Sequence, residues 1–201
     1  MRTIAPFTVA VVILAACTAE SRTNTGDTSA TSAASGGAAR SPTDSVPTTQ
    51  APAAGDWTVT PSGIGPIQVG MTVDELRRVA GDVAAPAGGA ECTYVRPASA
   101  PRGVSVMLAS GRVVRVDVDS AGVRTDAGVA VGDSAMKVEQ TYVGRITTTP
   151  HKYVPGGQYL AVRAISPADS MLRIVFESEA GRITRFRSGR APEVDLVERC
   201  G

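Results

Sequence analysis

The residues best suited to acid–base or metal chemistry are few in this sequence and lie far apart. His151 is the only histidine. A catalytic triad or a metal centre needs partners at set spacings, and neither Gly-x-Ser-x-Gly nor His-Glu-x-x-His occurs. Asp117 and Asp119 share one face of a predicted strand, as a carboxylate pair would, but alternation alone explains their spacing. We therefore predict no catalytic residue, no metal ligand and no cofactor, and expect His151 to be a solvated loop residue.

Charged residues of both signs are mixed near the C-terminus. The arginines are Arg182, Arg185, Arg187 and Arg190, and the surrounding glutamates are Glu177, Glu179 and Glu193. A mixture of this kind is typical of a solvated strand face rather than of an anion-binding strip.

The segment 151–159 is the best candidate for contact with a partner. It contains His151, Tyr153 and Tyr159, with a predicted Pro-Gly-Gly turn between the two tyrosines. Exposed tyrosines can anchor a partner protein, and a cross-strand pair in a hairpin explains them equally well. We retain His151, Tyr153 and Tyr159 as candidate partner-binding residues.

The N-terminus of the chain has the features of a secretory signal. Arg2 precedes an apolar run that is too short to span a membrane, and small residues follow it. The sequence Leu-Ala-Ala-Cys at positions 14–17 resembles the lipobox of bacterial lipoproteins. The resemblance implies that residues 1–16 are a signal peptide and that Cys17 becomes a lipidated N-terminus. Since Thr18 follows Cys17, and not Asp, it also implies an outer-membrane location, facing the periplasm.

With Cys17 assigned to lipidation, two cysteines remain in a compartment that permits disulfides. Cys92 and Cys200 are an even pair, so we predict a bond between them. Such a bond would close a loop of about 100 residues and contribute up to about 5 kcal/mol in the chain-entropy model. Two free buried thiols are the alternative.

Residues 17–55 form the predicted lipidated cysteine and a disordered tether rich in Ser, Thr, Ala and Pro, since they have too little apolar surface to fold. Removal of Arg2 with the signal leaves 19 basic and 19 acidic residues, so the mature chain has no net charge. It therefore lacks the excess of basic residues with which proteins bind the phosphates of nucleic acid. The membrane is then reached through the lipid alone.

The predicted globular domain, residues 56–201, contains an internal repeat. Three pairs of segments match in the same order: 60–64 with 125–129, 69–72 with 131–134, and 110–113 with 180–183. We place repeat one at about 57–122 and repeat two at about 123–201.

Each repeat is predicted to begin with a helix and to continue in strands. Thr72 and Glu75 form a capping box for the first helix, and Ser134 caps the second, where Lys137 replaces the glutamate. In the strands that follow, Val114, Val116 and Val118 alternate with polar residues. The expected fold is therefore α+β: two tandem helix-plus-antiparallel-strand repeats forming one sheet with helices on one face.

The run Val-Gly-Met-Thr at positions 69–72, followed by a helix ending at Gly81, resembles the opening of the repeat in BamE/SmpA outer-membrane lipoproteins and β-lactamase inhibitory proteins. The match covers about ten residues, and Asp133 and Ser134 depart from it in the second repeat. Gly, Met and Thr have structural roles in this motif, so the resemblance implies a fold and no binding residue.

Two classes of function remain. One is a membrane-anchored cell-envelope lipoprotein that acts as a binding or assembly module for an envelope protein or glycan. The other is a periplasmic enzyme of unrecognised type, which a pocket holding His151 and a carboxylate would favour. The missing catalytic motifs favour the binding module.

Overall fold

The computed structural model describes residues 57–83 and 91–200. The predicted signal peptide, Cys17 and the predicted tether lie outside the described residues. Of the described strands, three short ones form the smaller sheet, β1 (Val59–Thr60), β2 (Gly63–Ile64) and β3 (Ile67–Gln68). Seven form the larger sheet, β4 (Cys92–Val95), β5 (Val104–Ala109), β6 (Arg112–Val118), β7 (Ile146–Pro150), β8 (Gln158–Arg163), β9 (Leu172–Glu179) and β10 (Arg182–Arg190).

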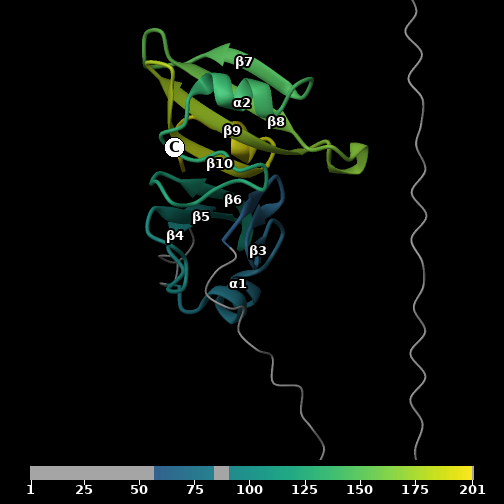
Figure 1. The fold of residues 1–201 in the computed structure, drawn as a ribbon. Coiled ribbons are helices and arrows are strands. Elements are labelled where there is room, and N and C mark those ends of the chain that lie inside the picture. The colour runs from purple at the N-terminus through teal and green to yellow at the C-terminus, as the bar shows by residue number, and fades with distance from the viewer. Residues whose placement is uncertain (1–56, 84–90, 201) are drawn as a thin grey trace, which may run out of the picture. The chain divides into compact units, whose positions relative to one another are not determined.

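The seven-stranded sheet is antiparallel throughout, in the order β4-β5-β6-β10-β9-β8-β7 (Figure 1). The α-helices of the described part are α1 (Val73–Ala80) and α2 (Ala135–Thr141), of eight and seven residues. Two 3-10 turns are present as well, η1 (Pro167–Asp169) and η2 (Glu193–Asp195).

The predicted α+β fold is therefore wrong, because the described chain is mostly β and has two sheets. The expected single sheet with helices on one face fails for two reasons. Residues 59–68 form a separate sheet whose two-residue strands have no readable periodicity. The helices are each only about two turns long, too short to cover a seven-stranded sheet, which the smaller sheet helps to cover.

The main core lies between the apolar face of the larger sheet and a layer made of the smaller sheet and both helices. Fully buried side chains from each part pack in one cluster; they include Ile64, Ile67, Leu76, Val106, Val138, Leu160, Phe176 and Phe186. Phe176 and Phe186 face each other on neighbouring strands, with ring centroids 5.3 Å apart. Apart from these two rings and Tyr142, the buried side chains of the cluster are aliphatic, so aliphatic side chains supply most of the buried apolar area of the core.

The helix caps match the prediction. Thr72 Oγ1 accepts from the amide of Glu75 at 3.3 Å, and Glu75 Oε2 accepts from the amide of Thr72 at 2.8 Å. Ser134 Oγ accepts from the amide of Lys137 at 3.1 Å. Lys137, which takes the place of the box glutamate, bonds instead to Asp133 at 2.8 Å. The first helix therefore has a full capping box and the second a single cap.

The two segments that matched in sequence also make the same local contact. Gly70 donates to the carbonyl of Val113 at 2.7 Å, and Gly132 donates to the carbonyl of Ile183 at 2.8 Å. The hairpins that carry these carbonyls turn at Ser110–Gly111 and at Ala180–Gly181, and φ is positive at all four positions. Positive φ at both central residues is the condition for the tight hairpin turn that fits twisted strands.

The polar face of the larger sheet is covered by residues 191–200, which we call the C-terminal strap. Its turn η2 packs on β6, β9 and β10. The strap ends at Cys200, which is bonded to Cys92 of β4 across 108 positions, so the predicted disulfide is confirmed. Side chains that alternation placed in solvent are therefore buried under this segment.

Candidate binding groove

A groove opens onto the apolar face of the larger sheet where the covering layer is incomplete. Its floor includes Val162 of β8 and Ile174 of β9, which lie directly opposite each other in the sheet. Both are buried, at 0% and 1% exposure, so they support the floor from below and the groove is reached through its wall residues. The cavity measures about 480 Å³, within the range of sites that hold small ligands or short peptide segments.

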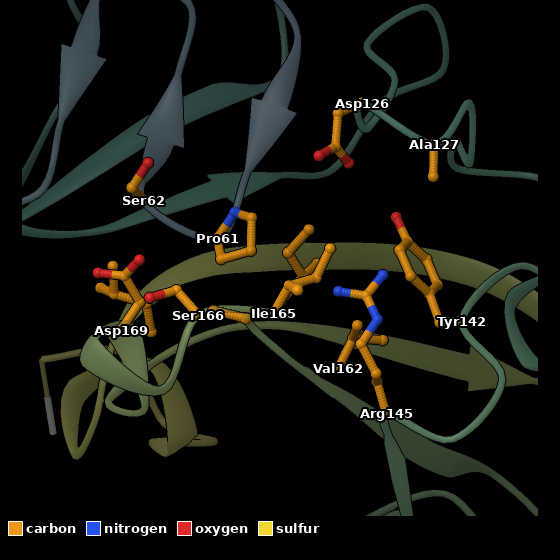
Figure 2. Close-up of a pocket in the computed structure, with 13 residues that line it drawn as sticks. Pro61, Ser62, Asp126, Ala127, Tyr142, Arg145, Val162, Ile165, Ser166 and Asp169 are labelled. Atoms are coloured by element: carbon orange, nitrogen blue, oxygen red, sulfur yellow. The ribbon is translucent and has the colours of Figure 1, made fainter.

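The walls come from segments far apart in the chain (Figure 2). Pro61 and Ser62 come from the turn between β1 and β2, and Asp126 and Ala127 from the turn before α2. The remaining walls are Tyr142, Arg145 and the connection between β8 and β9, with Ala164, Ile165, Ser166 and Asp169. Most of this wall therefore belongs to residues 123–201.

Ile165 is the most exposed large apolar residue of the described chain, at 82%. It lines the wall of the groove, whose floor includes Val162 (Figure 2). A single exposed aliphatic residue is ordinary on a surface, but one that extends an apolar floor enlarges a contact area for a ligand. Ile165 is therefore the accessible apolar part of the groove.

Two side chains of opposite charge, Arg145 and Asp126, line the groove. Arg145 lies over the ring of Tyr142, 5.1 Å from its centroid, and donates through Nη1 to the carbonyl of Arg163 at 3.2 Å. Asp126 lies across the groove from it (Figure 2). Among the salt bridges of the described residues, none joins Arg145 to Asp126. Both charged groups can therefore still bind the polar atoms of a ligand.

Tyr142 is a structural residue of this site. It is 2% exposed, and its hydroxyl bonds to Thr125 Oγ1 at 2.8 Å. Burial raises the pKa of Tyr142, and the Thr125 hydrogen bond partly opposes that rise. The ring of Tyr142 supports the guanidinium of Arg145 in the wall of the groove.

The structure brings the three candidate partner-binding residues together, with the ring of His151 6.5 Å from that of Tyr153, but it exposes them to different degrees. Tyr153 is 58% exposed, whereas Tyr159 is 8% exposed and packs with Val175, Ala191 and Val194. The ring of His151 is stacked on that of Tyr159, with centroids 4.5 Å apart. Of the three, Tyr153 offers its ring to a partner, and the partner-binding role stays a prediction.

His151 is not the solvated loop residue that the sequence suggested. Its side chain is 6% exposed, and Nδ1 accepts from the amides of Tyr153 and Val154 at 3.1 Å each. Nε2 lies 3.5 Å from the carboxylate of Glu177, whose side chain is also 6% exposed. Neither residue lines the groove. The pair holds the β7–β8 hairpin against β9.

Of the mixed charges near the C-terminus, Arg182, Arg185 and Arg190 are exposed, as expected for a solvated face, whereas Arg187 and Glu177 are buried. Arg187 is 2% exposed; it bonds to Glu177 and donates from Nε to the carbonyl of Val194 at 2.6 Å. Asp117 is also buried and pairs with Arg115, so it forms no carboxylate pair with Asp119. These charges fasten the C-terminal strap to the sheet.

Within residues 57–83 and 91–200, no three His, Cys, Asp or Glu side chains are grouped as metal ligands. Neither helix of that part is long and apolar enough to cross a membrane. Cys17, the predicted lipidation site, lies outside it. Sequence reasoning missed the groove residues Asp126, Arg145 and Ile165. The one available signal was an aliphatic residue, Ile165, directly before the turn residues Ser166 and Pro167.

No protein-family model and no curated protein matches this chain. Among solved structures, it is similar to the uncharacterized protein yfeY from Escherichia coli, with 11% identity and a TM-score of 0.42, over 66% of this chain and 99% of that one. It is also similar to an extracellular protein containing a SCP domain from Bacillus anthracis str. Ames, with 12% identity and a TM-score of 0.36. That match covers 61% of this chain and 44% of the other.

Proposed function

We propose that this chain is a lipid-anchored protein of the cell envelope that binds a short segment of another envelope protein in the groove beside Arg145. The anchor is Cys17, because the residues before it resemble a lipobox. The same resemblance puts the protein at the outer membrane, facing the periplasm, since Thr18 follows the anchor. The Cys92–Cys200 bond supports an oxidising compartment of this kind.

The observation that carries the binding function is the combination of an apolar floor with two charges that are not paired with each other. Ile165, which is exposed, and Leu172, which is half-buried, can contact an aliphatic side chain of the bound segment. Arg145 can donate to a backbone carbonyl of that segment, and Asp126 can accept from a backbone amide. An extended peptide supplies an apolar side chain and both backbone groups within a few residues.

A protein segment fits this groove better than a glycan does. The one aromatic residue in its wall is Tyr142, whose ring is buried and whose hydroxyl is bonded to Thr125. That ring cannot offer its face to a sugar. The floor is aliphatic, and aliphatic side chains of a partner gain most from such a surface.

Site-specific crosslinking in the native membrane tests the proposal. A photoreactive residue at Ser166, on the exposed wall, should form an adduct with one defined envelope protein. Ile165→Asp in the same chain should reduce that adduct about tenfold or more, because the new carboxylate would be desolvated by the bound apolar side chain. Since Ile165 is exposed, the thermal midpoint should change little.

Met136→Asp is the matched control. Met136 is 63% exposed on α2 and does not line the groove, so the adduct should persist. An adduct that Ile165→Asp leaves undiminished, or that Met136→Asp removes equally, contradicts binding in the groove. The anchor is tested separately by Cys17→Ser, which should move the protein from the membrane fraction to the soluble fraction.

A further inference from the structure

A second pocket lies on the polar face of the larger sheet, between the C-terminal strap and the edge strand β7. It measures about 430 Å³, and we call it the arginine pocket. Strands β7, β8 and β9 lie side by side at this edge of the sheet, and each contributes to the lining (Figure 1). From β8 the lining includes Ala161 and Arg163, whereas Val162 between them belongs to the floor of the groove. The pocket and the groove therefore occupy opposite faces of the same strands.

Two arginines of the arginine pocket stand directly opposite each other, Arg163 on β8 and Arg173 on β9. The amide of Ala164 donates to the carbonyl of Leu172 at 3.2 Å, so this next pair along the ladder is the hydrogen-bonded one. Arg163 and Arg173 are therefore a non-hydrogen-bonded pair, the kind that brings side chains closer together. Like charges at such a position are destabilising, and an anion between them would remove that cost.

The described residues balance only part of this charge. Asp195 of the strap lies 3.3 Å from Arg173, between Oδ2 and Nη1, and it is itself exposed. None of the salt bridges within residues 57–83 and 91–200 includes Arg163. The Arg163 side chain makes one long hydrogen bond in that part, from Nη2 to the carbonyl of Gly144 at 3.5 Å. The pocket therefore has an unbalanced positive charge at Arg163, which is exposed to solvent.

The hydrogen-bonding capacity of Arg173 is also incompletely used. Its Nε is buried and has no hydrogen-bond partner in the described part of the chain. Buried donors without a partner are rare in proteins. The third arginine of the lining, Arg187, differs because it is buried and paired with Glu177. The facing pair is therefore the part of the pocket that is poorly satisfied without a ligand.

We propose that the arginine pocket binds a small organic anion, with the carboxylate of the ligand between Arg163 and Arg173. A guanidinium binds a carboxylate through two parallel N–H donors, so two facing arginines can engage both oxygens. Thr147 and Thr149 are exposed on the β7 side of the pocket, and their hydroxyls can donate to the same group.

The rest of the pocket fits a short apolar chain attached to that carboxylate. Away from the arginines, the lining includes Ala161 and Val197, which are half-buried, and Pro150, which is exposed. Ala161 lies two residues from Arg163 on the same face of β8, so a chain can extend along the strand from the charged end. The volume of about 430 Å³ is within the range of small-ligand sites. The ligand class is therefore an aliphatic carboxylate.

Hexanoate is the probe for this site. It is added at low ionic strength to the full chain carrying Cys17→Ser, with the Cys92–Cys200 bond intact. A two-dimensional NMR titration should give a Kd on the order of 1 mM, as expected for a ligand of few atoms. Hexanol, which lacks the charge, and acetate, which lacks the chain, should each bind about tenfold more weakly. Hexanol binding as tightly overturns the role of the arginines, and acetate binding as tightly overturns the apolar part of the site.

Three substitutions locate the binding. Arg163→Gln should weaken hexanoate binding about tenfold. Asp195→Asn removes the carboxylate that competes for Arg173, so hexanoate should bind about three- to fivefold more tightly. Arg78→Gln is the matched control, because Arg78 is exposed on α1 and lies outside the pocket, and affinity should not change.

Equal weakening by Arg163→Gln and Arg78→Gln would reduce the effect to net charge and overturn the site. Weaker binding in Asp195→Asn would overturn the placement of the carboxylate beside Arg173. Hexanoate bound in the groove beside Arg145 would leave the affinity of Arg163→Gln unchanged, which also overturns the proposal.

Thermal unfolding gives a second measurement. A ligand that binds only the folded chain raises the thermal midpoint, and hexanoate at ten times its Kd should raise that of the parent by about 3 °C or more. The same addition should shift Arg163→Gln by under about 1 °C. An equal rise in both chains overturns the site. Neither Arg163 nor Arg173 lines the groove, so failure here leaves the groove proposal intact.

Discussion

The guanidinium of Arg115 donates from Nη1 to the carbonyl oxygen of Leu196 at 2.7 Å, across 81 positions of the chain. The same nitrogen donates to the carbonyl of Glu193 at 3.2 Å. The other side of the guanidinium binds Asp117, whose second partner is the hydroxyl of Tyr94 at 3.0 Å. A buried ion pair is thus also the main polar contact between β6 and the C-terminal strap.

Replacing Arg115 with Met should lower the free energy of unfolding by about 3–5 kcal/mol. The change leaves Asp117 buried without its cation and leaves two strap carbonyls without a donor. Urea unfolding measures the loss, and hydrogen exchange should show faster exchange in residues 193–199. Arg185→Met is the control, because the Arg185 side chain is 52% exposed, and it should cost under about 1 kcal/mol. Equal losses in both variants would contradict this account.

The second link between the C-terminal strap and the larger sheet is the Cys92–Cys200 disulfide. Replacing Cys92 and Cys200 together with Ser should lower the free energy of unfolding by about 2–5 kcal/mol, since the bond closes a loop of 108 positions. Urea unfolding of the oxidised parent, the reduced parent and the double variant measures this. The reduced parent and the double variant should agree. A double variant as stable as the oxidised parent would show that the strap is held without the bond.

Local patterns predicted the local structure well. Thr72 and Ser134 cap the helices as expected, and the hairpins turn at Gly111 and Gly181. The disulfide followed from counting the cysteines left after Cys17. These features depend on residues close in sequence, or on a short list of candidates. Periodicity and capping are sufficient for that kind of inference.

Long-range coverage was not predictable in the same way. The alternation of Val116 with Arg115 and Asp117 indicates a strand with one polar face, and it does not show whether that face meets water or another segment. The segment that covers it lies some 80 positions later and binds through backbone carbonyls, which leave no mark in a sequence. The groove likewise combines four separate segments. The strap therefore overturns the expected solvated face of β6, while the fold class was wrong for another reason, the second sheet made of two-residue strands.

The difference between the two helix caps can be measured. Thr72→Ala should lower the free energy of unfolding by about 1–2 kcal/mol. The change removes the acceptor for the amide of Glu75, and it removes the hydroxyl that helps to hold the Glu75 carboxylate against the amide of Thr72. Ser134→Ala should cost less, about 0.5–1 kcal/mol, because that cap consists of one hydrogen bond to Lys137. Urea unfolding of both variants decides the order. A larger loss for Ser134→Ala would contradict the assignment of a full capping box to α1.

The hydroxyl of Tyr94 should make stability depend on alkaline pH. Burial, and next the neighbouring carboxylate of Asp117, raise the pKa of Tyr94 well above its ordinary value near 10. Above about pH 10 the unfolded chain loses this proton while the folded chain keeps it. The unfolded state is then favoured, so stability falls as the pH rises from about 10 toward the pKa of the folded form.

Tyr94→Phe isolates this contribution. At pH 8 the variant should be less stable than the parent by about 1 kcal/mol, because the hydrogen bond to Asp117 is lost while the ring beneath Arg199 remains. Between pH 10 and pH 11 the difference in free energy of unfolding between parent and variant should narrow or reverse, since the variant has no hydroxyl to ionise on unfolding. Urea unfolding at pH 8, 9, 10 and 11 measures the gap at each step. A gap that is constant from pH 8 to pH 11 would show that the pKa of Tyr94 is the same in the folded and unfolded chains.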